Sequence, residues 1–326
     1  MDTTTRITHL KWMILGRALD DRLAKLKAQG EVPGSVFQGR GQEAYSAAGA
    51  MFLKRGDCYA PLIRDTAGRL VFGDFPLEAI RTHIGRRTGR MKGRDGNIHR
   101  GDPDLGLLPM ISHLGAMISV VNGTLLAKRL TGRLADHVGL VSIGDGAMNT
   151  GATHEALNQA AVERLPLVVQ VADNQVAYST FSDRTYACRD LVDRAVGYGM
   201  GSLTCDGTDA DACLATMHEA IARARRGEGP QMVVAKLLRL AGHGTHDDAA
   251  YVTDEMKSRF GDCLQLAERT LKVQGVIDEV GIAALWEEAR ASIQVAVTQA
   301  LAEPIPVAAD EDWCAYSERN LTELRA

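Results

Sequence analysis

The segment HVGLVSIGDGAMNTGATHEALNQAAVERLPLVVQVADNQ, residues 137–175, carries the clearest signal of the fold. It holds two apolar, β-branched runs, HVGLVSI and PLVVQVA, with a helix-forming segment between them. Near-continuous apolar strands that alternate with helices are typical of a parallel sheet buried on both faces. Each run ends in a polar turn, with Asp145 after the first and Asn174 after the second.

The two turns are expected to meet, because ligands of parallel sheets bind outside the carboxyl ends of the strands. Asp145 and Asn174 are 29 positions apart, which is enough for a crossover containing one helix. Their oxygens suit Mg²⁺, which completes its octahedron with water and phosphate oxygens. Gly144 and Gly146 allow close backbone approach, and a helix starting near Ala147 would offer free N–H groups. The pattern therefore predicts a metal–diphosphate site and not a dinucleotide fingerprint, since the GxGxxG spacing is missing.

Composition narrows the class of protein. The chain has 326 residues, 45% of them apolar and 24% charged, which is ordinary for a soluble globular protein. Its net charge of −4 gives no electrostatic reason to expect nucleic acid or a membrane surface as a partner. The six cysteines form no CxxC pair, and the N-terminus lacks the apolar run of a signal peptide. We expect reduced thiols and a cytoplasmic protein.

Periodicity predicts an α/β fold, with a mostly parallel sheet, helices on both faces, and helical N- and C-terminal extensions. No linker-like break interrupts residues 30–300, so a single domain over 1–326 is expected. Asp74 is expected to cap a helix that has Pro76 in its first turn. The other expected elements are an amphipathic N-terminal arm over 1–30, helices over 41–57 and 111–130, an aperiodic loop over 91–109, alternating strands and helices over 137–238, helices over 254–302, and a polar tail over 303–326.

The spacing of GDG and the Asn-bearing turn resembles the thiamine diphosphate motif. Three further segments, GQEAYSAAGAMFLKRGD, LIRDTAG and RLAGHGTHDD, are similar to segments of one family. That family is the α subunit of the E1 component of 2-oxo acid dehydrogenase complexes and of the related acetoin dehydrogenases. The similarity runs in unbroken order from about residue 8 to 275. It implies a thiamine diphosphate-binding fold of the diphosphate-binding type.

The resemblance implies a role for each residue of the site. Asp145, Asn174 and the main-chain carbonyl of Val176 would bind Mg²⁺. The N–H groups of Gly146 and Ala147, next to Gly144, would hold the diphosphate. The remaining positions are Arg64 on a diphosphate oxygen, the Met110 carbonyl facing the aminopyrimidine amine, and His243 beside the reacting carbon and the terminal phosphate. The departures from the family pattern are Asp173 in place of an Asn, Val176 and Ile63 in place of aromatic residues, and His113 in place of Gln.

The partners also follow from the resemblance. Thiamine diphosphate needs a Glu at its pyrimidine ring, and no segment of this chain resembles a pyrimidine domain. A separate β chain in an α2β2 heterotetramer is therefore implied, together with a lipoyl-bearing E2 partner. The implied activity is decarboxylation of a 2-oxo acid and transfer of the acyl group to lipoamide, which His243 would assist. Three alternatives stay open: an acetoin dehydrogenase α subunit, a repurposed E1 α homologue in biosynthetic acyl transfer, and an unrelated Mg²⁺–diphosphate binder.

Two features bear on the substrate and on the loop that carries His243. Ile63 and Met110 lie nearest the expected acyl pocket with His113, and their apolar side chains favour a small or branched aliphatic group over a charged one. The loop over 240–252 is expected to become ordered when the cofactor binds. Its HxxHDD run is also compatible with a metal cluster, but the rest of the chain offers no second set of ligands. We expect Thr245 or His246 to be the neighbour that orders this loop.

Overall fold

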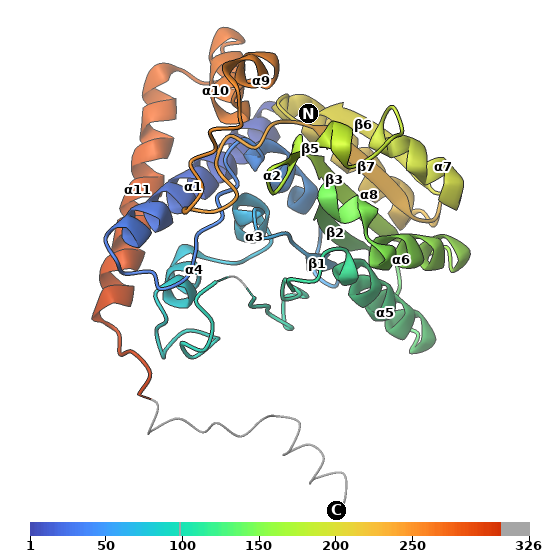
Figure 1. The fold of residues 1–326 in the computed structure, drawn as a ribbon, viewed down its shortest axis with the longest axis horizontal. Helices are drawn as coiled ribbons and strands as arrows, with labels where there is room; N and C mark the ends of the chain where they lie inside the picture. Colours follow the sequence, from blue (N-terminus) through green and yellow to red (C-terminus); the bar gives the residue numbers. More distant parts are fainter. Residues whose placement is uncertain (98, 308–326) are drawn as a thin grey trace, which may run out of the picture.

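The centre of the computed structural model, which describes residues 1–97 and 99–307, is a parallel sheet (Figure 1). The strand order is β1-β2-β3-β7-β6, and every neighbouring pair is parallel. The predicted α/β fold with a mostly parallel sheet is confirmed. The strands are β1 (Cys58–Ala60), β2 (Gly139–Gly144), β3 (Leu167–Asp173), β6 (Gly201–Asp206) and β7 (Gln231–Lys236), and a short antiparallel hairpin joins β4 (Val176–Ala177) to β5 (Thr180–Phe181).

The strands are buried on both faces, as their unbroken apolar runs predict. Successive side chains point to opposite faces of a strand. Leu140 and Val168 belong to one hydrophobic cluster, whereas Val141 and Val169 belong to the other. Two separate cores therefore hold helices against the two faces of one sheet.

The helices divide between these two cores. In Figure 1, α5, α6 and α7 lie on one side of the sheet, and α1 and α11 lie on the other. The predicted N- and C-terminal helical extensions are confirmed. The α-helices are α1 (Thr3–Ala28), α2 (Glu43–Met51), α3 (Thr66–Val71), α4 (Pro76–His83), α5 (Ala116–Leu130), α6 (Gly151–Val162), α7 (Arg194–Tyr198), α8 (Ala210–Arg225), α9 (Asp254–Phe260), α10 (Cys263–Val273) and α11 (Glu279–Ala302).

The first helix has clear local causes. The Asp2 side chain accepts from the N–H of Thr5 at 2.7 Å, and two lysines lie in the last turn, where cations favour the helix dipole. Leu10, Ile14 and Leu19 are buried on one side of α1. This helix packs against α2, α3 and α11, so it is an integral part of one core.

Three local expectations are wrong. Asp74 does not cap α4; its carboxylate lies between Arg69 and Arg100, and Phe75 is the residue before Pro76. No α-helix starts near Ala147, because a short 3₁₀ turn (Gly146–Asn149) comes first and Thr150 caps α6. The helix expected over 111–130 begins only at Ala116, after a left-handed Gly115.

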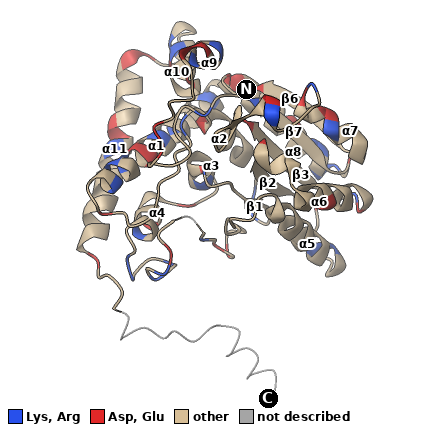
Figure 2. Ribbon diagram, in the orientation of Figure 1, with Lys and Arg blue, Asp and Glu red and all other residues tan. Residues whose placement is uncertain are grey.

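The distribution of charged residues and the hydropathy of the helices fit the composition of the chain. Figure 2 shows acidic and basic residues interspersed along α1. Within the described part of the chain, no helix is both long enough and apolar enough to span a bilayer. The polar tail that is predicted over 303–326 lies outside the described residues from 308 onward.

Candidate active site

The predicted site residues follow four parallel strands at their carboxyl ends. Arg64 follows β1, Asp145 follows β2, Asn174 follows β3 and His243 follows β7. Gly144 of β2 pairs with Ala172 of β3, and the N–H of Asp145 donates to the carbonyl of Ala172 at 3.1 Å. The two polar turns therefore leave neighbouring strands side by side, as the sequence predicts.

Two carboxylates are buried together where β2 and β3 end. Asp145 and Asp173 are each 1% exposed, and the hydroxyl of Ser182 donates toward both of them, at 3.2 and 3.4 Å. Tyr186 donates to the other oxygen of Asp173 at 3.0 Å. Burial, and next the charge of Asp173, raises the pKa of Asp145 to about 6. A cation at this point would offset the cost of two buried negative charges.

The amide of Asn174 is oriented by a residue from a distant helix. Its Nδ2 donates to the side-chain oxygen of Gln42, just before α2, at 2.7 Å. Its Oδ1 then faces the main chain two residues on, where the N–H of Val176 lies at 3.4 Å. Gln175, between them, has a φ of 71°, which turns the backbone sharply at this point. The Oδ1 of Asn174 is thus presented toward the turn and not toward Gln42.

Two guanidinium groups are buried beyond the carboxyl ends of β1 and β7. Arg64 donates to the carbonyls of Gln38 at 3.0 Å and His243 at 2.7 Å. Arg239 donates to the carbonyls of Val176 and Tyr178, at 3.2 and 2.7 Å. Neither side chain forms an ion pair with a carboxylate among the described residues. Burial, and next the charge of Arg239, lowers the pKa of Arg64 to about 9.

The segment that carries His243 has its own internal hydrogen bonds. Asp247 accepts from the N–H of His243 at 2.6 Å and from the hydroxyl of Tyr251 at 2.5 Å. The Tyr251 oxygen in turn accepts from Arg239. The imidazole of His243 packs on the ring of Tyr178, with centroids 4.2 Å apart. Burial, and next the two nearby guanidiniums, lowers the pKa of His243 to about 4, so the ring is neutral at pH 7.

The GDG turn combines one tight contact with one open side. A Cβ atom on Gly146 would lie 2.7 Å from the Cβ of Ala177, so the hairpin after β3 requires glycine here. A Cβ atom on Gly144 would meet nothing within 4 Å. The backbone before Asp145 therefore faces space into which a ligand group can enter.

Comparison with known proteins identifies the family. Residues 10–309 match the model of the dehydrogenase E1 component. The chain belongs to this family. It is 32% identical to the α subunit of acetoin:2,6-dichlorophenolindophenol oxidoreductase of Cupriavidus necator, over 94% of this chain and 92% of that protein. It is 30% identical to the 2-oxoisovalerate dehydrogenase subunit alpha of Bacillus subtilis, over 93% and 92%. It is 31% identical to the pyruvate dehydrogenase E1 component subunit alpha of Rhizobium meliloti, over 73% and 68%.

These similarities confirm the resemblance on which the sequence interpretation rests. This E1 chain is an α-type subunit of the 2-oxo acid and acetoin dehydrogenase class, an oxidoreductase, and the family in general implies thiamine diphosphate. It also implies, in general, a β subunit and an E2 component as partners.

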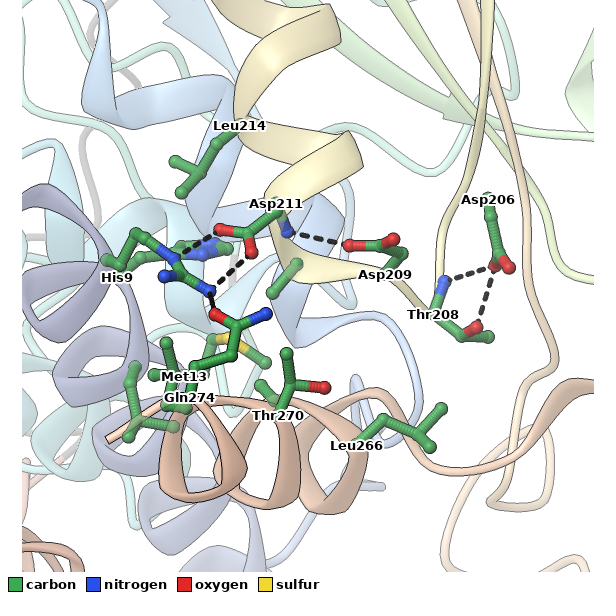
Figure 3. Close-up of a pocket in the computed structure, with 15 residues that line it drawn as sticks. His9, Met13, Asp206, Thr208, Asp209, Asp211, Leu214, Leu266, Thr270 and Gln274 are labelled. Atoms are coloured by element: carbon green, nitrogen blue, oxygen red, sulfur yellow. Dashed lines mark hydrogen bonds and ion pairs between the residues drawn. The ribbon is translucent and has the colours of Figure 1, made fainter. Parts of the chain in front are cut away.

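Two cavities lie outside the cluster of predicted residues. One, of about 330 Å³, borders Gly242, Gly244 and Gln38 beside the His243 segment. Another, of about 320 Å³, lies between α1, α8 and α10 (Figure 3). In Figure 3, Asp211 and Gln274 meet at the edge of this second cavity, where both accept from Arg6. No residue of the predicted site lines the second cavity, so it is separate from the E1 site.

The metal cluster considered for HxxHDD is not formed. Asp247 is used within its own segment, and His246 lies 3.5 Å from the hydroxyl of Ser35. No group of three or more potential ligands among His, Cys, Asp and Glu occurs in the described ranges. The N–H of Thr245 donates to the carbonyl of Val36 at 3.0 Å, which ties the segment to the chain before α2. That Thr245 or His246 orders the segment stays a prediction.

The other predicted positions differ in exposure. Met110 is 7% exposed, Ile63 is half-buried, and His113 is exposed with its carbonyl accepting from Ala116 at 3.2 Å. Sequence reasoning missed Arg239 and Gln42 as members of the site. Both lie inside the segments that carry the resemblance, and Arg239 comes three residues after a buried strand ends. A basic residue at that place was the available signal.

Proposed function

We propose that this E1 chain binds thiamine diphosphate together with Mg²⁺ at the carboxyl edge of the sheet. Asp145, Asn174 and the carbonyl of Val176 would hold the metal. The buried guanidiniums of Arg64 and Arg239, which have no carboxylate partner among the described residues, carry this proposal. Buried charge is costly unless it is compensated. A diphosphate would compensate these two guanidiniums, and Mg²⁺ would do the same for Asp145 and Asp173.

Each residue would then have a limited task. When bound, thiamine diphosphate supplies the centre that adds to a carbonyl and stabilises the resulting negative charge. Arg64 would contact a diphosphate oxygen through its fork of donors, and Gly146 and Ala147, beside the open side at Gly144, would donate backbone N–H groups. The carbonyl of Met110 would orient the aminopyrimidine amine. His243 would position substrate and assist transfer of the acyl group to lipoamide, as a neutral imidazole.

A β subunit is proposed to close the site. Tyr178 is 59% exposed although it packs on His243, and Leu114 is 56% exposed although its carbonyl bonds to Thr150 at the start of α6. Large exposed apolar residues beside a site of this kind are typical of a protein interface. We propose an α2β2 heterotetramer, in which residues 1–326 of each α chain act as one domain, and a lipoyl-bearing E2 that receives the acyl group.

We propose a small or branched aliphatic 2-oxo acid as the substrate. The half-buried Ile63 and the buried Met110, at the positions expected to face the acyl group, support this choice. Acetoin is the second candidate, favoured by the 32% identity over nearly the whole chain to an acetoin oxidoreductase α subunit.

The test is a panel of 2-oxo acids and acetoin with the co-expressed αβ complex. An artificial electron acceptor such as 2,6-dichlorophenolindophenol removes the need for E2. We expect turnover with pyruvate or a branched-chain 2-oxo acid, and dependence on added thiamine diphosphate and Mg²⁺. Fastest turnover with 2-oxoglutarate would contradict the aliphatic pocket. No turnover with any member of the panel would favour a repurposed subunit.

A further inference from the structure

One peptide group links a buried acid of α1 to the arginine of the proposed site. The carbonyl of Gln38 accepts from Nη1 of Arg64 at 3.0 Å. The N–H of Gly39, in the same peptide group, donates to Oδ2 of Asp20 at 2.7 Å. The peptide is therefore held from both sides, by Asp20 at its N–H and by Arg64 at its carbonyl.

Asp20 also holds the chain on the far side of Arg64. Its Oδ1 accepts from the hydroxyl of Thr66 at 2.7 Å, and Thr66 is the first residue of α3. Gly39 in turn touches the backbone of Arg64: a Cβ atom on Gly39 would lie 2.2 Å from the Arg64 carbonyl oxygen. Asp20, at 3% exposure, thus joins the two segments that fix the backbone and one donor of this arginine.

The guanidinium of Arg64 is held between two carbonyls. One belongs to Gln38, and the other belongs to His243 at 2.7 Å. Without the Asp20 carboxylate, the N–H of Gly39 would be buried without a partner, at a cost that a small rotation of the peptide would relieve. The same rotation would move the carbonyl of Gln38 and release one side of Arg64.

We propose that Asp20 is a positioning residue for Arg64 and, through it, for the diphosphate. This inference rests on the proposed function, in which Arg64 contacts the diphosphate. Asp20 itself touches neither the cofactor nor the reacting atoms, and acts through the peptide between Gln38 and Gly39.

The neighbouring Asp21 is a matched control. It also contacts the segment around Gly39, but through side chains: it accepts from Arg40 at 2.7 Å and from Nε2 of Gln38 at 3.3 Å. Its side chain is 35% exposed, so water can replace these contacts. Substitutions at Asp20 and Asp21 therefore distinguish the loss of a backbone contact at Gly39 from the loss of side-chain contacts in the same segment.

The experiment measures the affinity of the αβ complex for thiamine diphosphate by calorimetry at saturating Mg²⁺. We expect Asp20→Ala to weaken binding about tenfold, in line with the loss of a hydrogen bond to a charged group, and Asp21→Asn to leave it unchanged. Asp20→Asn is expected to rescue most of the affinity, because the amide oxygen can accept from Gly39 and the amide nitrogen can donate to Thr66.

A double-mutant cycle separates positioning from general destabilisation. Added to Arg64→Ala, Asp20→Ala is expected to cost less than about twofold more, because the group that it positions is already gone. Full additivity, wild-type affinity in Asp20→Ala, or no rescue by Asn would overturn the inference. If Asp20→Ala does not assemble, Thr66→Val tests the same link and should weaken binding about threefold; unchanged affinity would count against it. Wild-type complex that binds no thiamine diphosphate would overturn the proposed function itself.

Discussion

Two regions of this E1 chain bury arginines in opposite ways. Between α1, α2 and α10, Arg17 meets Glu43 and forms two hydrogen bonds to Asp262, at 2.9 and 3.0 Å. At the carboxyl edge of the sheet, Arg64 and Arg239 meet only carbonyls and a tyrosine oxygen. Burial lowers the pKa of Arg17, but its two acids outweigh burial and raise it, whereas the pKa of Arg64 falls to about 9.

The two regions differ in whether buried charge is neutralised within the chain. A buried ion pair is complete within the chain, and removing one partner leaves an uncompensated charge. The site instead places guanidiniums near two carboxylates without pairing them. Carbonyl dipoles and the Ser182 hydroxyl hold these groups in place. Under the proposed function, their charge stays available to a diphosphate and a metal ion.

The largest change in cofactor affinity is expected from removing the acidic group of the proposed metal site. Asp145→Ala should lower the affinity for thiamine diphosphate with Mg²⁺ by more than about a hundredfold, because the ion loses its only proposed carboxylate ligand. Asn174→Ala should weaken binding less, since a water can replace a neutral oxygen. Calorimetry with the β chain present measures both. Unchanged affinity in Asp145→Ala would remove the metal assignment.

The second prediction compares the same substitution at a paired and at an unpaired buried arginine. Arg17→Met should lower the free energy of unfolding by about 3 kcal/mol, because Glu43 is left buried and unpaired, and should leave cofactor affinity of the folded complex unchanged. Arg64→Met should weaken the cofactor about tenfold or more with little loss of stability, because it breaks no ion pair. Denaturant unfolding and calorimetry on both variants measure the contrast. Equal loss of stability in the two variants would remove the distinction between the regions.

The third prediction concerns the segment over 240–252. Arg239, Tyr251 and Asp247 already connect it, and a diphosphate would add a partner near His243. We expect limited proteolysis of this segment to slow several-fold on addition of thiamine diphosphate and Mg²⁺. Tyr251→Phe removes the hydroxyl that joins Arg239 to Asp247 and should reduce the protection. Equal cleavage with and without cofactor would argue against coupling.

The smallest effect concerns pH. Burial, opposed by the hydrogen bonds from Gly39 and Thr66, and then the charge of Glu43, raises the pKa of Asp20 to about 7. Because the folded state then holds this proton more tightly than the unfolded state, the free energy of unfolding falls as pH rises from about 4 to about 7. Asp20→Asn should therefore be more stable than wild type at pH 8, with no difference near pH 4. Chemical unfolding at both pH values measures it. A constant difference would exclude titration of Asp20 as the cause.

Local pattern explains which parts of this fold could be predicted. The apolar runs over 137–143 and 166–172 predict buried parallel strands, because period and composition are local properties. The structure places these strands at 139–144 and 167–173. The expected helix start near Ala147 is wrong, because a 3₁₀ turn over Gly146–Asn149 comes first and α6 begins after its cap at Thr150. Local composition does not distinguish such a turn from the first turn of an α-helix. The expected helix cap at Asp74 is wrong because of contacts outside the local sequence. An Asp two residues before a proline is typical of a cap, but Arg69 and Arg100, which lie outside that helix, bind its carboxylate.

The order of strands and helices along the chain is enough to predict the parallel sheet and the placement of Asp145 and Asn174 after successive strands, because strand direction and crossover length follow from that order. How these groups are held depends on contacts between segments that are distant in the sequence. Gln42 orients Asn174 from the start of α2, Arg239 reaches the carbonyl of Val176, and Asp20 reaches the peptide that faces Arg64. Such contacts join residues 19 to 132 positions apart. They depend on the relative placement of packed helices and strands, which no local pattern encodes.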